Sequence, residues 1–102
     1  MSSISEVFHK AMQQGDGVLI GYIMAGDPSP ELTPQVADAL ISGGVEILEL
    51  GLPFSDPIAD GPTIQAASVR ALAANTTPMK VLEIAKEIKQ QHNVPIVVMT
   101  YY

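Results

Sequence analysis

The sequence has no cysteine, and only 5 of its 102 residues are basic. Without cysteine, neither a disulfide framework nor a thiolate metal site can form, and small secreted scaffolds usually depend on such cross-links. Five basic residues against 11 acidic ones give a net charge of −6, which repels a phosphate backbone. We therefore expect a protein of the reducing cytoplasm that does not bind nucleic acid.

Long apolar runs are also missing. The longest, at residues 18–25, is interrupted by Gly21 and falls far short of the roughly 20 residues that a membrane span requires. The N-terminus carries no apolar signal core. At 102 residues and 47% hydrophobic composition, the chain has enough apolar material for one compact domain or a piece of one. We expect it to be soluble and to make no contact with membranes.

Hydrophobic periodicity predicts alternating helices and strands. Ser3 and Glu6 have the spacing of a capping box, and apolar residues at helical intervals predict a helix that ends at Gly15. Compact apolar runs without polar alternation predict buried strands at residues 18–24, 45–51 and 96–102. Apolar stripes predict three further helices, one capped by Ser29 or Thr33, one that begins at Pro62, and one capped by Thr77.

This order of elements calls for right-handed crossovers and a parallel sheet, and thus for an α/β fold. An open doubly wound sheet and a slice of an eight-stranded barrel both satisfy the pattern. The phosphate fingerprints of the first class are absent, because no glycine-rich dinucleotide turn follows the first strand and no P-loop lysine motif is present.

Glu49 lies near the C-terminal end of a strand that we expect to be covered on both faces. An ionised carboxylate in such a place costs several kcal/mol unless it is paired or solvated in a cleft. Parallel α/β sheets place their sites at these strand ends, and a carboxylate there suits proton transfer. We therefore predict a functional role for Glu49, with a carboxylate satisfied by backbone amides or a lysine as the structural alternative.

Asp60 follows Glu49 by 11 positions, in a loop that leaves the same end of the sheet. A second carboxylate close to the first is geometrically possible, although an Asp near a helix that starts with Pro is also a common capping residue. Asp56 and Asp27 each precede a proline and are interpreted as turn formers. These acids could suggest a Mg²⁺ site, but no paired-ligand spacing or histidine ligand supports one, so we predict no metal.

The tyrosines stand near predicted strand ends, and the histidines on or near helices. Tyr22, Tyr101 and Tyr102 are interpreted as packing residues, one of which could stack on a flat aromatic substrate. His9 and His92 are expected to be solvated.

The run ELGLPFSDPIADGPTIQ at residues 49–65 closely resembles the signature segment of tryptophan synthase alpha chains. Gly21 with residues 25–28 is similar to the first strand and turn of that family, and residues 99–102 are similar to the end of its third strand. The resemblance covers essentially the whole chain. It implies the first three parallel strands, with their helices, of a (β/α)8 TIM barrel, with residues 1–102 as an N-terminal fragment of a single domain.

The same resemblance implies an alpha subunit of tryptophan biosynthesis, a lyase that cleaves indole-3-glycerol phosphate by a retro-aldol reaction to indole and glyceraldehyde 3-phosphate. It implies that Glu49 is the general acid/base and that Asp60 holds the indole N–H. Tyr22 and Tyr102 match positions that line the indole pocket, where Tyr22 replaces a Phe often found in the family.

The loop from Pro53 to Asp60, with Asp56 and Pro57, corresponds to the family's contact surface with the beta subunit. That subunit carries pyridoxal phosphate, so the resemblance implies no cofactor in this chain and an alpha2beta2 complex for the full-length protein.

Length is the main departure from the family. Such a barrel has roughly 250 residues, and the family's phosphate-binding loops follow position 102. We therefore expect this chain to be inactive alone. Two other functions stay open: a truncated barrel that acts only as an assembly or beta-subunit-binding module, and a different barrel enzyme that uses paired acids with Mg²⁺.

Overall fold

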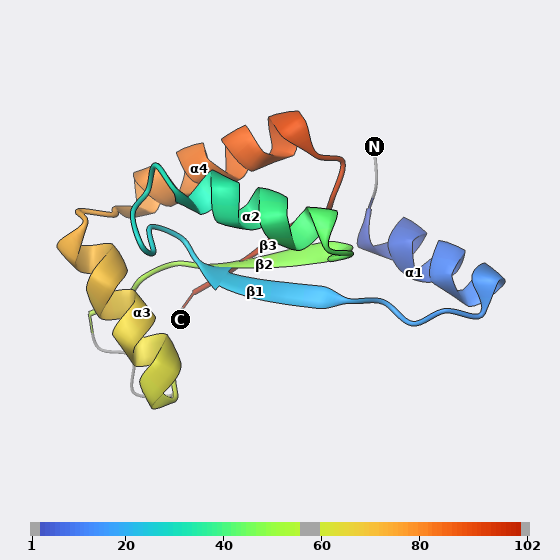
Figure 1. The fold of residues 1–102 in the computed structure, drawn as a ribbon, viewed down its shortest axis with the longest axis horizontal. Helices are drawn as coiled ribbons and strands as arrows, with labels where there is room; N and C mark the ends of the chain where they lie inside the picture. The colour runs from blue at the N-terminus through green and yellow to red at the C-terminus, as the bar shows by residue number, and fades with distance from the viewer. Residues whose placement is uncertain (1–2, 56–59, 101–102) are drawn as a thin grey trace.

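Three parallel strands and four helices make up the described part of the chain, residues 3–55 and 60–100 of a computed structural model (Figure 1). The strands pair in the order β1-β2-β3. The predicted α/β class and parallel sheet are confirmed. In chain order the elements are α1 (Ile4–Gln14), β1 (Ile20–Met24), α2 (Thr33–Ser42), β2 (Ile47–Gly51), α3 (Pro62–Ala73), α4 (Pro78–Gln91) and β3 (Ile96–Met99).

One face of the sheet carries the main core. Helices α2 and α4 lie side by side across it (Figure 1). Leu48 and Leu50 of β2 point toward these helices and are fully buried. From α4, Val81, Ile84 and Ile88 complete the contact. Full burial of each such side chain contributes roughly 1.5–3 kcal/mol, so this layer holds the sheet and the two helices together.

The other face of the sheet is only partly covered. Ile20 and Tyr22 of β1 are 47% and 38% exposed, although Ile47 on the neighbouring strand is buried. The prediction that the first strand is covered on both faces is therefore wrong for most of β1, because in the described part of the chain α3 packs on this face only at Met24 and leaves Ile20 and Tyr22 partly exposed. Ile20 and Tyr22 alternate along β1, and in a closed barrel such alternate residues of each strand point into the barrel interior.

The local signals for helix ends fall where the sequence predicts them. The Ser3 hydroxyl accepts a hydrogen bond from the Glu6 backbone N–H at 3.1 Å, and α1 ends at Gly15 in the left-handed region, with φ of 72°. The Thr77 hydroxyl accepts from the Lys80 N–H at 3.1 Å and starts α4. Each of these side chains satisfies a helix N–H group that has no partner within its helix.

The start of α2 differs from both predicted alternatives. The helix begins at Thr33, but neither Ser29 nor Thr33 is its capping residue, a position that Leu32 takes without a side-chain hydrogen bond. The Thr33 hydroxyl is used elsewhere, because it donates to the Ser29 carbonyl and accepts from the Gly26 N–H, both at 2.9 Å. Thr33 thus fixes the loop after β1 instead of capping the helix.

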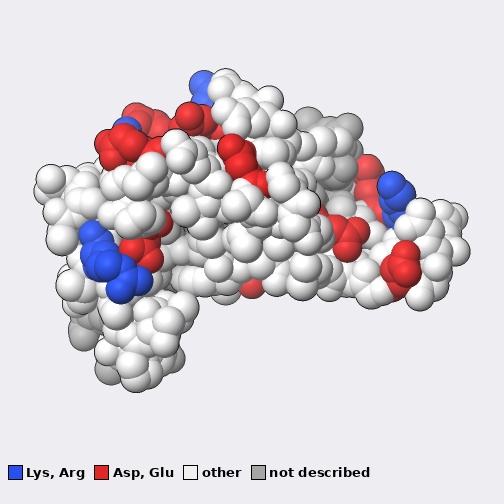
Figure 2. All heavy atoms as spheres, viewed as in Figure 1, with Lys and Arg blue, Asp and Glu red and all other residues white. Residues whose placement is uncertain are grey.

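The surface agrees with the acidic composition. Figure 2 shows acidic side chains spread over much of the viewed face, with basic side chains at fewer places. Across residues 3–55 and 60–100, no helix has both the length and the apolar character needed to cross a bilayer.

Candidate active site

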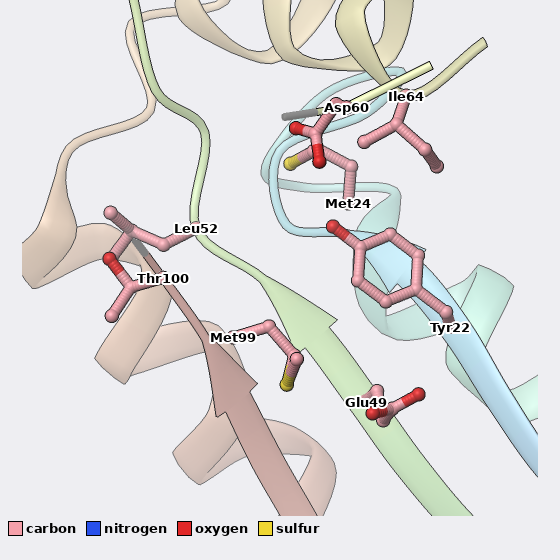
Figure 3. Close-up of a pocket in the computed structure, with 8 residues that line it drawn as sticks. All are labelled: Tyr22, Met24, Glu49, Leu52, Asp60, Ile64, Met99 and Thr100. Carbon is pink, nitrogen blue, oxygen red and sulfur yellow. The ribbon is translucent and has the colours of Figure 1, made fainter. Parts of the chain in front are cut away.

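A pocket of about 420 Å³ lies toward the C-terminal ends of the strands (Figure 3). All three strands and α3 contribute to it or to the segments beside it. Its lining residues in the described part of the chain are Tyr22, Met24, Glu49, Leu52, Asp60, Ile64, Met99 and Thr100. Because parallel α/β proteins place their sites at these strand ends, the pocket is the candidate active site.

Glu49 reaches the pocket through the alternation of β2. The parallel register sets Glu49 beside Tyr22 on β1 and beside Val97 on β3. Its neighbours Leu48 and Leu50 face the helices, so the Glu49 side chain must point to the opposite face, where it is half-buried. Within residues 3–55 and 60–100, no lysine and no backbone amide bonds its carboxylate. The structural alternative for this residue therefore finds no support in the described chain.

Tyr22 lies against Gly51, the last residue of β2. A Cβ atom at position 51 would stand 2.0 Å from the Tyr22 hydroxyl oxygen and 2.7 Å from the ring carbon that bears it. Only a residue without a side chain leaves room for this ring. This role of Gly51 was not predicted, although a glycine inside a strand often marks such a close approach.

Asp60 enters the pocket from the segment before α3. The capping residue of that helix is Gly61, and no side chain makes a cap hydrogen bond there. The Asp60 backbone carbonyl accepts a hydrogen bond from Gln65 Nε2 at 2.8 Å, while its carboxylate lines the pocket. The structure thus places Asp60 as a pocket residue and not as the helix cap. In Figure 3 the Tyr22 ring lies between the Glu49 and Asp60 carboxylates.

The pKa of Tyr22 depends on the charges of both Asp60 and Glu49. Burial raises the pKa of the Tyr22 phenol above its ordinary value, and the negative charges of Asp60 and then Glu49 raise it further. The folded chain therefore holds this proton more tightly than the unfolded chain does. The resulting contribution to stability is complete below the ordinary pKa of 10.0 and is lost as the pH rises through the folded-state pKa of Tyr22.

This arrangement predicts the effect of neutralising either acid. Asp60→Asn and Glu49→Gln should each lower the Tyr22 pKa, and Asp60→Asn should lower it more, because Asp60 is the stronger of the two charged causes. The measurement is an absorbance titration of the phenolate in a chain with Tyr101→Phe and Tyr102→Phe. An unchanged Tyr22 pKa in the Asp60→Asn chain would contradict the geometry.

Comparison with known proteins identifies the family to which this geometry belongs. The family model for the tryptophan synthase alpha chain matches residues 8–102. The chain belongs to this family. The tryptophan synthase alpha chain of Methanosarcina acetivorans is 54% identical over 99 residues, which are 97% of this chain and 36% of that protein. That of Methanoregula boonei is 51% identical and is covered to 37% of its length.

Solved structures of tryptophan synthase alpha chains share the fold. The alpha subunit from Legionella pneumophila is 39% identical, with a TM-score of 0.94 over 99% of this chain and 39% of that one. A chain of tryptophan synthase from M. tuberculosis, in an aminoacrylate-bound form, is 34% identical with a TM-score of 0.91, and the match covers 99% of this chain and 41% of that one. The predicted partial TIM barrel is thereby confirmed, and the chain spans about 36–38% of the curated relatives that it matches.

The alpha-chain resemblance gives roles to residues both inside and outside the described part of the chain. Tyr102, Asp56 and Pro57 lie outside the described residues. Pro53 is described and buried, and the exposed positions beside it are Phe54 and Ser55. No group of three His, Asp or Glu side chains in the described chain is placed to hold a metal ion.

Two side-chain pairs between distant parts of the chain were not predicted. Asp27, interpreted as a turn former, receives hydrogen bonds from Arg70, with Nε to Oδ1 at 2.8 Å and Nη2 to Oδ2 at 3.0 Å. His92, expected to be solvated, lies with Nε2 2.5 Å from Asp38 Oδ1 and has a side chain only 23% exposed. The partners are 43 and 54 positions apart, so no local pattern could have indicated either pair.

Proposed function

We propose that this chain supplies the acid and base groups of the tryptophan synthase alpha reaction in tryptophan biosynthesis. In that reaction indole-3-glycerol phosphate is cleaved to indole and glyceraldehyde 3-phosphate. The observation that carries the proposal is the placement of Glu49 and Asp60 in one pocket at the strand ends, with the Tyr22 ring between them. Two carboxylates on different elements of one pocket suit divided acid and base roles.

Each carboxylate has a definite task in this proposal. Glu49 as an acid gives a proton to the ring carbon that bears the glycerol chain, which leaves the ring nitrogen positively charged. Asp60 accepts the hydrogen bond of the ring N–H and stabilises that charge. The Glu49 carboxylate then takes the proton of the adjacent glycerol hydroxyl. The O–H electrons form the aldehyde, the carbon–carbon bond breaks, and its electrons return to the ring as neutral indole.

The rest of the pocket suits the indole ring better than the phosphate. Its wall is apolar, with Met24, Leu52, Ile64 and Met99 beside the Tyr22 ring, and its volume of about 420 Å³ is ample for a bicyclic aromatic group. None of the described lining residues is a cation that could hold a phosphate. We therefore propose that the 102-residue chain does not catalyse the reaction alone.

We also propose that a complete protein carrying this chain pairs with a beta subunit that holds pyridoxal phosphate. The support is indirect: the chain belongs to the alpha-chain family, and its similar structures include tryptophan synthase from M. tuberculosis. Phe54 and Ser55 are the exposed described positions in the segment that would face the partner.

A chimera tests the proposed reaction. Residues 1–102 are joined to the part of the Methanosarcina acetivorans alpha chain that follows its matched region, and release of indole from indole-3-glycerol phosphate is measured. We expect release by the chimera, and none by this chain alone or by the added part alone. A folded chimera that releases no indole would overturn the proposed reaction, and release by the 102-residue chain would overturn its proposed inactivity.

A further inference from the structure

Asp60 is attached to the N-terminal end of α3. It stands two positions before Pro62, the first residue of the helix, and its carbonyl is bonded by Gln65 in the first turns. In Figure 1, α3 projects away from the layer formed by α2 and α4. The position of this one helix therefore decides where the Asp60 carboxylate lies relative to β1 and β2.

The apolar contact of α3 with the sheet is small. Ala67 and Ala71 pack against Met24 of β1, with Ile64 at the margin, in a cluster separate from the main core. Two alanine methyl groups bury little apolar surface and interlock weakly with a neighbour. The buried Ser68 of the same helix accepts a hydrogen bond from the Phe54 N–H at 3.3 Å, and its Oγ lies 3.8 Å from Met24 Sδ. These contacts together form the first point of attachment of α3.

The pair of Asp27 and Arg70 supplies a second point of attachment. Arg70 Nε donates a hydrogen bond to Asp27 Oδ1 at 2.8 Å, and Arg70 Nη2 donates one to Asp27 Oδ2 at 3.0 Å. Such a two-bond pair fixes orientation as well as distance. Asp27 itself is held firmly, because the loop after β1 is tied by the bond from the Gly26 N–H to the Thr33 hydroxyl and by that from the Asp27 N–H to the Met24 carbonyl.

We propose that the Asp27–Arg70 pair positions Asp60 in the pocket by fixing α3 relative to β1. Arg70 lies eight residues beyond Pro62, or roughly 12 Å along the helix axis, so a small rotation at Arg70 displaces Asp60 at the other end. The Arg70 side chain is 55% exposed and the Asp27 side chain only 20%, and a two-bond pair of this kind fixes the placement of the two elements that it joins. The role of Asp60 in this inference rests on the proposed function, whereas the contact between Asp27 and Arg70 does not depend on that function.

Tyr22 is a probe of this placement, because the Asp60 charge helps to raise its pKa. Displacing Asp60 lowers the Tyr22 pKa. Removing the Arg70 cation by itself acts in the opposite direction, since the loss of a nearby positive charge raises the pKa of a phenol. The hydrogen bond and charge of Asp27 raise the pKa of Arg70 further, so the pair stays charged while Tyr22 titrates. A fall of the Tyr22 pKa in Arg70→Gln thus reports the displacement of a carboxylate.

The experiment is the absorbance titration of Tyr22 in the chain with Tyr101→Phe and Tyr102→Phe, with circular dichroism recorded at each pH. Arg70→Gln is expected to lower the Tyr22 pKa by most of the fall that Asp60→Asn produces, and to add little when combined with Asp60→Asn. Val69→Gln, which places the same residue at an adjacent position that is 65% exposed, should leave the pKa unchanged.

A purely stabilising role for Arg70 would change the denaturation midpoint and leave the Tyr22 pKa of the folded chain where it was. An unchanged or raised pKa in Arg70→Gln therefore overturns the proposal, and so does an ordinary Tyr22 pKa in the parent chain. If Arg70→Gln loses the helical circular dichroism signal, Arg70→Lys is measured instead. Lysine keeps the positive charge but cannot make the two-bond pair, so we expect a fall of the Tyr22 pKa smaller than that in Asp60→Asn. Because no activity is measured, failure here is distinct from failure of the chimera to release indole.

Discussion

Gly26→Ala is expected to destabilise the chain by roughly 3–5 kcal/mol, the sum of a strained backbone and a severe clash. Gly26 has a φ of 92°, a region that residues with a side chain rarely adopt. A Cβ atom at this position would stand 1.9 Å from Thr76 Oγ1 and 2.7 Å from Thr76 Cβ. Because Thr76 is buried and precedes α4, it cannot move aside without displacing the link between α3 and α4. Urea denaturation followed by circular dichroism measures the loss.

Two further variants separate the clash from the strain. Gly44 has a φ of 115° with nothing within 4 Å of an added Cβ, so Gly44→Ala should lose only the strain component of about 1–2 kcal/mol. Thr76→Ala removes the hydroxyl and methyl that crowd position 26, and it should partly restore Gly26→Ala. Thr76→Ala alone should have a small effect, because in the described chain the buried Thr76 Oγ1 has no hydrogen-bond partner. Equal losses for Gly26→Ala and Gly44→Ala would contradict the predicted clash.

The fold could be predicted wherever it depends on patterns within a few residues. Ser3 and Thr77 cap helices where their spacing indicates, and the apolar runs become parallel strands. The start of α2 could not be predicted, because the Thr33 hydroxyl was assigned to a cap while it bonds the distant Gly26 N–H. The exposure of Tyr22 on β1 was not predicted for a related reason. An apolar run predicts a buried strand, but it does not indicate which elements cover each face of that strand.

The part of the candidate site that depends on local patterns and on sheet topology could also be predicted. Glu49 stands out because a charge in an apolar strand needs a cleft, and alternation then decides which face it occupies. Its proximity to Asp60 follows from the topology of parallel sheets. The contact of Tyr22 with Gly51 and the pair of Asp27 with Arg70 depend on how separate elements pack, and no spacing rule reaches across those distances.

Glu49→Gln is expected to lower kcat of the chimera for indole release by about 10²–10⁴-fold, the usual contribution of a positioned acid or base. Gln has nearly the same shape and polarity as Glu but can neither give nor take a proton at neutral pH. The substitution therefore leaves the half-buried site filled, and KM should change little because the apolar wall that we expect to hold the indole ring is intact. Glu49→Asp keeps the acid but withdraws it by one methylene, so an intermediate loss is expected.

A neighbouring glutamate separates this role from a general effect of charge. Glu46 precedes the same strand and is exposed outside the pocket, and its Oε1 accepts from the Leu19 N–H at 3.4 Å. Glu46→Gln removes the same charge from the same segment, and it should leave kcat unchanged. The Tyr22 titration shows at the same time whether the pocket of Glu49→Gln is still formed. If the pocket is formed and kcat stays within about tenfold of the parent value, proton transfer does not depend on Glu49. Asp60 would then be the remaining described carboxylate in the pocket able to carry the proton.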